Sequence, residues 1–239
     1  MKFDSKDAAR AHAWEQLTER RQARFPFPVK GRIPNFAGAR EAAGRLFTLP
    51  IWEGVRAIKI NPDSPQLPVR EMALARGITL YMPTPRLAAG FMRFDPARIP
   101  ADKYREAATL SKCKPWAEEV SLEELPQVDL IVCGSVVITA TGKRCGKGHG
   151  YSDLEYGILR ALGHDPVPVL TTVHELQVAK DFPRDENDVP LSWIVTPERV
   201  IEVKNPPPAP TGIDWEKLSE KDLEEMPVLA DLKARVAPQ

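Results

Sequence analysis

Apolar residues along the chain follow two spacings, and these spacings predict alternating strands and helices. Short, mainly apolar runs, typical of buried strands, occupy residues 55–60, 78–82, 128–133, 136–139, 167–173, 192–195 and 200–203. Helical spacing of apolar residues is found between them, at residues 5–24, 35–47, 66–76, 103–111 and 153–162. Ser5 is placed to cap the first helix, whose buried side would carry Ala9, Ala13, Trp14 and Leu17.

This alternation predicts an α/β fold. A helix between successive strands lets neighbouring strands run parallel, so we expect a three-layer α/β/α arrangement with a mostly parallel sheet. Ligands of such sheets bind beyond the carboxyl ends of the strands. From residue 205 the sequence is rich in proline, and residues 215–236 are acidic with a helical pattern. We therefore expect one α/β domain at residues 1–204, followed at 205–239 by a proline-rich linker and an acidic helical segment.

The glycine-rich segment at residues 142–153 is the strongest candidate for chemistry. It follows an apolar strand pattern, precedes a helical one, and alternates Gly142, Gly146, Gly148 and Gly150 with Lys143, Arg144, Lys147 and His149. Glycine permits a backbone with positive φ and a close approach to a ligand. The N–H groups of such a loop bind anions, and the start of the next helix adds positive potential. The segment therefore predicts phosphate binding.

A surface loop without a ligand is the alternative, because glycine-rich loops are common. Two well-known phosphate motifs are absent. No Gly-Lys-Ser/Thr follows with the Walker A spacing, and the cationic residues between the glycines would crowd the turn of a dinucleotide fingerprint. The repeated alternation of glycine with cationic residues favours a phosphate loop of another kind.

Composition limits the expected partners and location. The chain has 239 residues, and 33 Lys and Arg balance 33 Asp and Glu. This balance gives no general attraction to nucleic acid or to membranes. Cys113, Cys133 and Cys145 have no CxxC spacing, so we expect neither disulfides nor zinc. Without a signal-peptide pattern or a long apolar run we expect a cytoplasmic protein. The sequence makes no prediction of an oligomeric state.

The pattern Arg-x-Gly-x-Gly-x-Gly-Tyr-x-Asp at residues 144–153 resembles the nucleotide loop of the 5-formyltetrahydrofolate cyclo-ligase family, the methenyltetrahydrofolate synthetases. Residues 32–38, 83–87, 146–151, 153–156, 173–178 and 212–215 are similar to the branch of methenyltetrahydrofolate synthetase domain-containing proteins. The resemblance implies the NagB/RpiA/CoA-transferase-like fold. It also implies a ligase of one-carbon metabolism that uses ATP and Mg²⁺ to convert 5-formyltetrahydrofolate into 5,10-methenyltetrahydrofolate.

The resemblance further implies which residues bind ATP and metal. Lys6 and Arg10, four positions apart on one helix face, match a Lys-x-x-x-Arg pair of the family; from spacing alone they would be solvated cations. The implied ATP-binding residues are Lys6, Arg10, Arg144, Gly146, Lys147, Gly148, His149, Gly150 and Tyr151. Of these, Arg144, Lys147 and His149 would be catalytic. Asp153 and Asp188 match magnesium positions; the alternatives are a helix cap for Asp153 and an exposed acidic loop for Asp188.

Substrate-binding positions of the family match Ile58, Asp63, Met92 and Tyr151. Asp63 stands where the family has a Glu that contacts the pterin, and a helix N-cap is its alternative role. For Ile58 and Met92, the alternative to substrate binding is packing in the hydrophobic core. His149 departs from the family, which often has Gly or Lys at this position. Because histidine changes its charge near neutral pH, a cationic role for His149 would depend on pH.

Two functions are therefore open. The first is the cyclo-ligase reaction on a folate, favoured by the retained Lys6, Arg10, Arg144 and Asp153. The second is a non-catalytic or repurposed nucleotide-binding relative with a thiamine-linked, regulatory or RNA-associated role, favoured by His149, Ser152 and Asp63. A nucleic-acid partner is suggested only by analogy with relatives in this branch.

Overall fold

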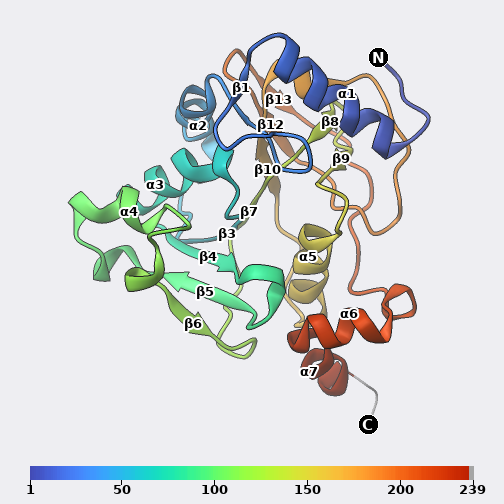
Figure 1. The fold of residues 1–239 in the computed structure, drawn as a ribbon. Coiled ribbons are helices and arrows are strands. Elements are labelled where there is room, and N and C mark those ends of the chain that lie inside the picture. Colours follow the sequence, from blue (N-terminus) through green and yellow to red (C-terminus); the bar gives the residue numbers. More distant parts are fainter. Residues whose placement is uncertain (237–239) are drawn as a thin grey trace.

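The computed structural model describes residues 1–236, and its centre is an eight-stranded sheet (Figure 1). The strand order is β13-β12-β10-β7-β3-β4-β5-β6. In that order the strands are Val200–Glu202, Trp193–Val195, Val169–Thr172, Leu130–Cys133, Ala57–Ile60, Thr79–Pro83, Phe91–Phe94 and Glu118–Val120. The strands from β12 to β4 pair in parallel, and β13, β5 and β6 pair antiparallel at the two edges. The predicted, mostly parallel sheet is confirmed.

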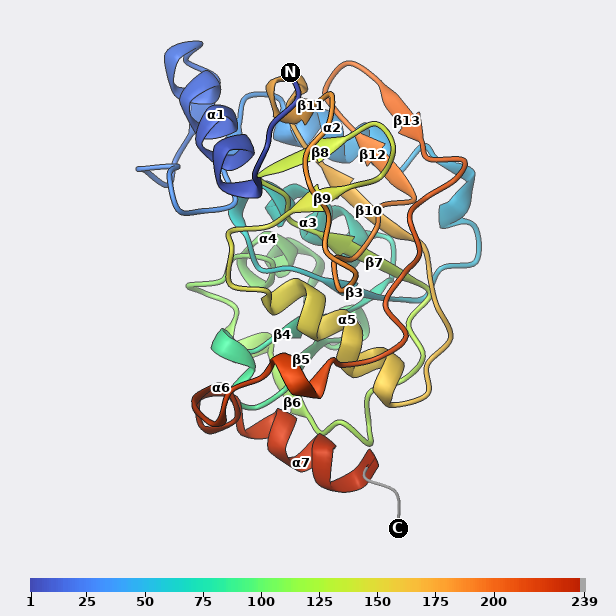
Figure 2. The ribbon, with the colours of Figure 1, turned by 90° about the vertical axis from the view of Figure 1, so that its right-hand side faces the viewer.

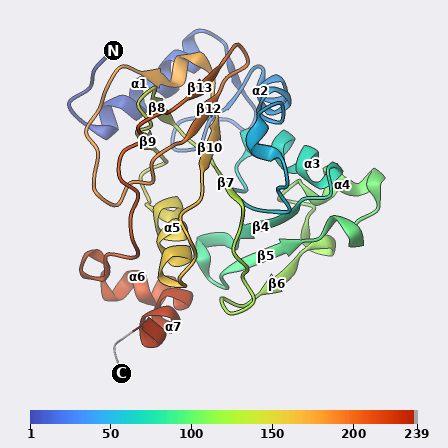
Figure 3. The ribbon, with the colours of Figure 1, turned by 180° about the vertical axis from the view of Figure 1, so that it is seen from behind.

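Helices cover both faces of this sheet (Figures 1 and 3), which confirms the predicted three layers. One face carries α2 (Ala39–Leu46), α3 (Leu67–Ala75) and α4 (Tyr104–Ala107), and the other carries α5 (Tyr151–Ala161). The apolar cluster under α2 and α3 includes Ile58 and Ile60 of β3. The cluster under α5 includes Ile158 and Leu159. Lys59 lies between the two isoleucines, so its side chain is directed to the α5 face.

The first helix, α1 (Lys6–Glu19), is shorter than the predicted segment 5–24. Ser5 caps it and Ala9, Ala13 and Leu17 are buried, as predicted. The helix ends early because Arg21 has a positive φ of 54° and residues beyond it form β1 (Ala23–Arg24). This strand pairs with β2 (Asn35–Phe36), so the helix expected at 35–47 begins only at Ala39.

A second, small sheet lies between α1 and the main sheet (Figure 2) and has the order β11-β8-β9. Its strands are Val178–Ala179, Val137–Thr139 and Arg144–Cys145. Ala9 and Ala13 of α1 belong to one apolar cluster with Val137 and Ala179 of this sheet and with Val136, which precedes β8. The predicted strand at 136–139 is thus confirmed, but β8 and β9 form a hairpin outside the main sheet. This hairpin holds the start of the glycine-rich segment close to α1.

The C-terminal segment contains α6 (Glu220–Glu225) and α7 (Pro227–Val236), which confirms the helical pattern at 215–236. Residues 237–239 lie outside the described residues. Figure 2 shows the segment running past α5 before α6 begins. Leu229 and Leu232 of α7 are fully buried in the same cluster as Ile158. The domain division after residue 204 stays a prediction, and the two parts share one apolar core.

None of the helices within residues 1–236 has the length and hydropathy needed to cross a membrane.

Leu229→Ala should lower the free energy of unfolding by about 2–5 kcal/mol, because it opens a cavity in the cluster shared by α5 and α7. The matched control is Leu110→Ala, because Leu110 is 48% exposed to solvent. That control should change the free energy of unfolding by no more than about 0.5 kcal/mol. Urea unfolding measures both, and equal small effects would show that α7 does not contribute to the cooperative core.

Candidate functional site

A cavity of about 930 Å³ opens beyond the carboxyl ends of β3 and β4, the edge at which a ligand was expected. Its lining comes from parts of the chain that are far apart in sequence. They include α1, the turns after β3 and β4, the segment from Arg144 to Gly157, the loop at residues 185–188 and the segment at residues 212–226. The cavity is of the size that protein pockets use for small organic ligands, roughly 300–1,000 Å³.

The glycine-rich loop connects β9 to α5 through two residues with positive φ, Gly148 at 110° and Gly150 at 70°. A Cβ atom on Gly148 would lie at an ordinary contact distance of 3.6 Å from the guanidinium carbon of Arg10, so the positive φ rather than the space favours glycine here. Gly150 is the N-cap of α5 and has no side chain that could accept hydrogen bonds from the first helical turn. The first N–H groups of α5 are therefore suited to an anion in the cavity.

Arg10 and Lys6 lie one helical turn apart, and both line the cavity beside this loop. Arg10 Nε donates to the Gly146 carbonyl oxygen over 2.8 Å, and Arg10 Nη1 donates to Asp7 over 2.6 Å. Lys6 Nζ lies 2.7 Å from Asp188 Oδ1 and also contacts Asp185. The structure thus brings the N-terminal cations and the loop together, as the resemblance to the family implied.

The ammonium group of Lys6 is held between two carboxylates. Burial lowers the pKa of Lys6, but hydrogen bonds to Asp185 and Asp188 outweigh this effect and raise it above its ordinary value. The same hydrogen bond from Lys6 lowers the pKa of Asp185. Lys6 is therefore a permanent cation at this end of the cavity, and its charge is already neutralised by the protein.

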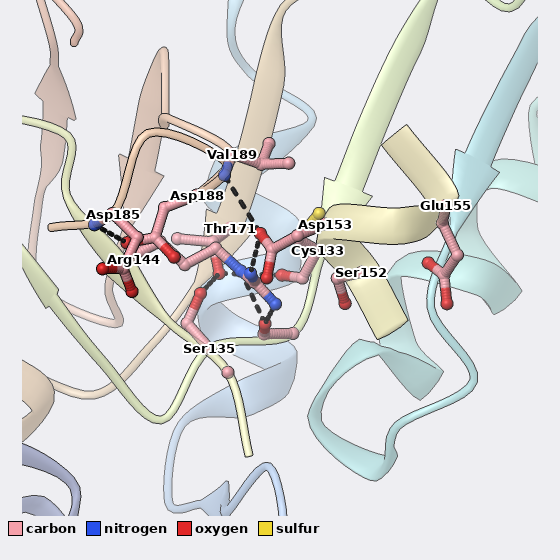
Figure 4. A network of polar contacts seen from close by, with 12 residues as sticks. Cys133, Ser135, Arg144, Ser152, Asp153, Glu155, Thr171, Asp185, Asp188 and Val189 are labelled. Carbon is pink, nitrogen blue, oxygen red and sulfur yellow. Dashed lines mark hydrogen bonds and ion pairs between the residues drawn. The ribbon is translucent and has the colours of Figure 1, made fainter. Parts of the chain in front are cut away.

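Arg144 is almost fully buried, and its guanidinium group faces the protein (Figure 4). Arg144 Nη2 and Nε donate to the carbonyl oxygen of Gly134 over 2.9 and 3.1 Å. Its Nη1 lies 3.4 Å from Asp153 Oδ1. These contacts connect the end of β7 to the first turn of α5. Arg144 is therefore placed to position Asp153.

Asp153 and Asp188 lie next to each other at the rim, because Asp153 Oδ1 accepts a hydrogen bond of 3.0 Å from the N–H of Val189 (Figure 4). Burial raises the pKa of Asp153, and the charge of Arg144 opposes this shift. Among the described residues, no three His, Cys, Asp or Glu side chains gather as a metal site. Two carboxylates beside the glycine-rich loop nevertheless fit Mg²⁺, which keeps several waters and usually takes only one or two protein carboxylates.

Asp63 and Tyr151 also line the cavity. The side chain of Asp63 forms an ion pair with Lys147, with 3.5 Å between Oδ1 and Nζ. Its backbone is at the N-cap of a 3₁₀ turn, Ser64–Gln66, but its carboxylate does not cap that turn. Tyr151 lies beside His149, with 6.0 Å between the two ring centroids. His149 is exposed at the tip of the loop.

Ile58 and Met92 are placed away from the cavity. Ile58 is fully buried in the cluster under α2 and α3, and Met92, on β5, packs against the same cluster. Successive residues of a strand face opposite sides of the sheet. In β3 it is therefore Lys59, not Ile58, that is directed to the cavity side.

A buried polar network beneath the cavity was not predicted. Lys59 forms an ion pair with Glu155 of α5, and both residues are nearly inaccessible to solvent. Asn61 accepts from Lys59 over 3.2 Å and donates to Glu155 over 3.2 Å and to Ser152 over 3.3 Å. Burial raises the pKa of Glu155, opposed by the charge of Lys59. The available sequence signal was a lysine between two isoleucines in an apolar strand.

The fold and this site define an α/β protein with a cationic glycine-rich loop at the carboxyl edge of its sheet. The sequence profile of the 5-formyltetrahydrofolate cyclo-ligase family matches residues 3–197. The chain therefore belongs to the 5-formyltetrahydrofolate cyclo-ligase family, and the resemblance of the loop is confirmed.

Named relatives agree with this assignment. The chain is 40% identical over 238 residues to the methenyltetrahydrofolate synthase domain-containing protein of Mus musculus and 37% identical over 238 residues to that of Homo sapiens. These matches cover 97% of this chain but only 64% and 62% of the relatives. A solved 5,10-methenyltetrahydrofolate synthetase from Aquifex aeolicus matches with a TM-score of 0.53 and 17% identity. That match covers 89% of this chain and 99% of the other, and it shows a shared fold.

Glu155→Leu should lower the free energy of unfolding by about 3–5 kcal/mol, because it leaves the Lys59 ammonium buried without a counter-charge. The double variant Lys59→Met/Glu155→Leu removes both charges and should recover most of that loss. Chemical denaturation of the wild type and the two variants measures this difference. A double variant as unstable as Glu155→Leu would contradict the ion pair as the cause.

Proposed function

We propose that this chain is an ATP- and Mg²⁺-dependent ligase that converts 5-formyltetrahydrofolate into 5,10-methenyltetrahydrofolate. The observation that carries the proposal is the meeting of Lys6 and Arg10 with the glycine-rich loop at one cavity. Two cationic side chains, loop N–H groups and a helix N-terminus are the groups that a triphosphate requires.

The proposed reaction has two steps. The formyl oxygen of the folate attacks the γ-phosphorus of ATP, and ADP leaves. N10 then attacks the activated formyl carbon, the C–O bond to phosphate breaks, N10 releases its proton, and the methenyl bridge forms. Both steps depend on placing the reacting atoms together and on neutralising phosphate charge.

The residues on the cavity surface fit these tasks. Arg10 and Lys147 would neutralise phosphate oxygens together with the N–H groups of the loop. Arg144 would act by positioning Asp153 rather than by touching phosphate, since its donors are taken by Gly134 and Asp153.

Asp153 and Asp188 are the residues that would hold Mg²⁺, which supplies charge neutralisation on the phosphates when bound. Asp188 now pairs with Lys6. Binding would therefore require Lys6 to leave Asp188 and turn to the nucleotide, four residues from Arg10 on the same helix face.

A second function has one specific observation in its favour. Asp63, at the position expected to contact the pterin, is paired with Lys147, so both charges are already occupied within the protein. A relative that binds nucleotide without the cyclo-ligase reaction would be compatible with this pairing. Its thiamine-linked, regulatory or RNA-associated role would then depend on partners of the whole protein.

Absorbance of the methenyl product separates the two functions. The purified chain is mixed with 5-formyltetrahydrofolate, ATP and Mg²⁺, with controls that omit each component. Product formation that needs all three supports the ligase. Nucleotide binding without product supports the second function, and absence of nucleotide binding contradicts both.

Lys147→Ala should weaken binding of Mg-ATP by about 10- to 100-fold, which corresponds to the loss of one charge-assisted contact of about 1.5–3 kcal/mol. The unpaired Asp63 carboxylate would add repulsion. Lys204→Ala is the matched control, because Lys204 is an exposed lysine away from the cavity lining. Calorimetry measures both affinities, and equal values for the two variants would count against the loop as the phosphate site.

His149→Lys tests whether the tip of the loop reaches the phosphate chain. If the side chain at position 149 faces a phosphate, a lysine there supplies a charge-assisted contact and should tighten Mg-ATP binding by about tenfold. Calorimetry on the wild type and the variant measures the two affinities. Equal affinities would show that the side chain at position 149 does not contact phosphate.

A further inference from the structure

The cavity is lined by a carboxylate to which the proposed reaction gives no role, that of Glu155. Its Oε2 atom accepts hydrogen bonds from Lys59 and Asn61. Its Oε1 atom accepts none from the described residues, and it is not among the side-chain atoms that are sealed from solvent without a partner. Glu155 as a whole is only 3% exposed. A hydrogen bond needs a single accessible atom, however, and Oε1 is such an atom on the cavity side.

Ser152 supplies a hydrogen-bond donor beside this acceptor. Ser152 and Glu155 are three residues apart on α5 (Figure 4), so they share a helix face. The Nδ2 atom of Asn61 joins them, because it donates to Glu155 Oε2 over 3.2 Å and to Ser152 Oγ over 3.3 Å. Oγ is the acceptor in that bond, so its own hydrogen is left for another partner. Ser152 lines the cavity and is only partly buried.

The acceptor and the donor are held in fixed positions through Asn61. The Oδ1 atom of Asn61 accepts from Lys59 over 3.2 Å. Its backbone carbonyl accepts a hydrogen bond of 2.7 Å from the buried Arg70, and its N–H donates to the carbonyl of Val132 over 3.1 Å. A ligand that bonds to Glu155 Oε1 therefore has little side-chain freedom to remove, which favours binding in one orientation.

We propose that Glu155 and Ser152 bind the edge of an amino-substituted nitrogen heterocycle. Glu155 Oε1 accepts from the exocyclic amine, and the Ser152 hydroxyl donates to the neighbouring ring nitrogen. The inference rests on the proposed function, because both of its substrates carry such an edge, in the aminopyrimidine ring of the pterin and in the adenine of ATP.

The chemistry of the two groups selects this kind of ligand. An ionised carboxylate accepts hydrogen bonds and cannot donate them, so Oε1 requires an N–H or O–H group. A phosphate or carboxylate group of either substrate is repelled from it. A ring without the amine would leave Oε1 covered and unpaired, and such a mismatch gives strong discrimination. Asp63 is less suited to this task, because its carboxylate is paired with Lys147.

The test compares two double variants that both remove the buried ion pair. Lys59→Met/Glu155→Leu removes the acceptor, whereas Lys59→Met/Glu155→Gln keeps a carbonyl oxygen in its place. Calorimetry on the full chain measures 5-formyltetrahydrofolate and Mg-ATP separately. The leucine variant should bind one of these ligands about tenfold more weakly than the glutamine variant. It should bind the other within about twofold of the glutamine variant. The affected ligand identifies the ring that contacts Glu155.

Ser152→Ala tests the donor without disturbing the buried charges. It should weaken binding of the same ligand by about fivefold and leave the other near the wild-type affinity. Mg-ITP is the probe for adenine, because its base carries an oxygen in place of the exocyclic amine. If adenine contacts Glu155, the wild type should bind Mg-ATP about tenfold more tightly than Mg-ITP, and the leucine variant should bind the two alike.

Three results would overturn the inference. They are equal affinities of the two double variants for both ligands, an equal weakening of both ligands, and an effect of Ser152→Ala on neither ligand or on the wrong one. If a double variant does not fold, Ser152→Ala decides alone. If the wild type forms the methenyl product while one of these results holds, only the role of Glu155 and Ser152 fails. If the wild type binds neither ligand, the proposed function fails with it.

Discussion

The hydrogen bond from Arg10 to the carbonyl of Gly146 joins the two halves of the candidate site. It requires α1 to lie against the glycine-rich loop, and the small sheet of β11, β8 and β9 provides the surface on which α1 packs. The positive φ of Gly148 gives the loop the backbone turn with which it lies against the guanidinium group. Two cationic side chains of α1, the backbone N–H groups of the glycine-rich loop and the N-terminus of α5 thereby lie at one cavity.

The charges of the site fall into two kinds. Lys6 with Asp185 and Asp188, and Lys147 with Asp63, are pairs at the cavity surface. Such partly exposed pairs contribute little free energy, so a phosphate or a metal ion can replace one partner at low cost. The Lys59–Glu155 pair is buried, and separating it would leave a charge without water or counter-ion. The pairs at the cavity surface can therefore release a partner to a ligand. The buried Lys59–Glu155 pair instead keeps β3 and α5 in register beneath the cavity.

The sequence predicted the central strands well, because strands buried on both faces are continuous apolar runs such as residues 78–82 and 128–133. It did not predict β5 or β6 at the sheet edge, where β6 has the sequence Glu-Glu-Val and edge strands commonly carry charges. The loop was found because glycine and cationic residues alternate locally. The Lys59–Glu155 pair spans 96 positions and depends on the packing of α5 on β3, which no local pattern encodes. Ile58, which the resemblance matched to a substrate position, instead has its alternative role in the core, because the side to which a residue of a short buried strand points is not visible in an apolar run.

A crystal structure with Mg²⁺ and a non-hydrolysable ATP analogue would test most directly whether α1 and the loop form one nucleotide site. The account predicts the triphosphate against the N–H groups of residues 146–151, with Arg10 and Lys147 on its oxygens. It also predicts Mg²⁺ on Asp153 and Asp188, with Lys6 separated from Asp188. A nucleotide bound elsewhere, or bound in the cavity with the Lys6–Asp188 pair intact and no contact to Arg10, would contradict it.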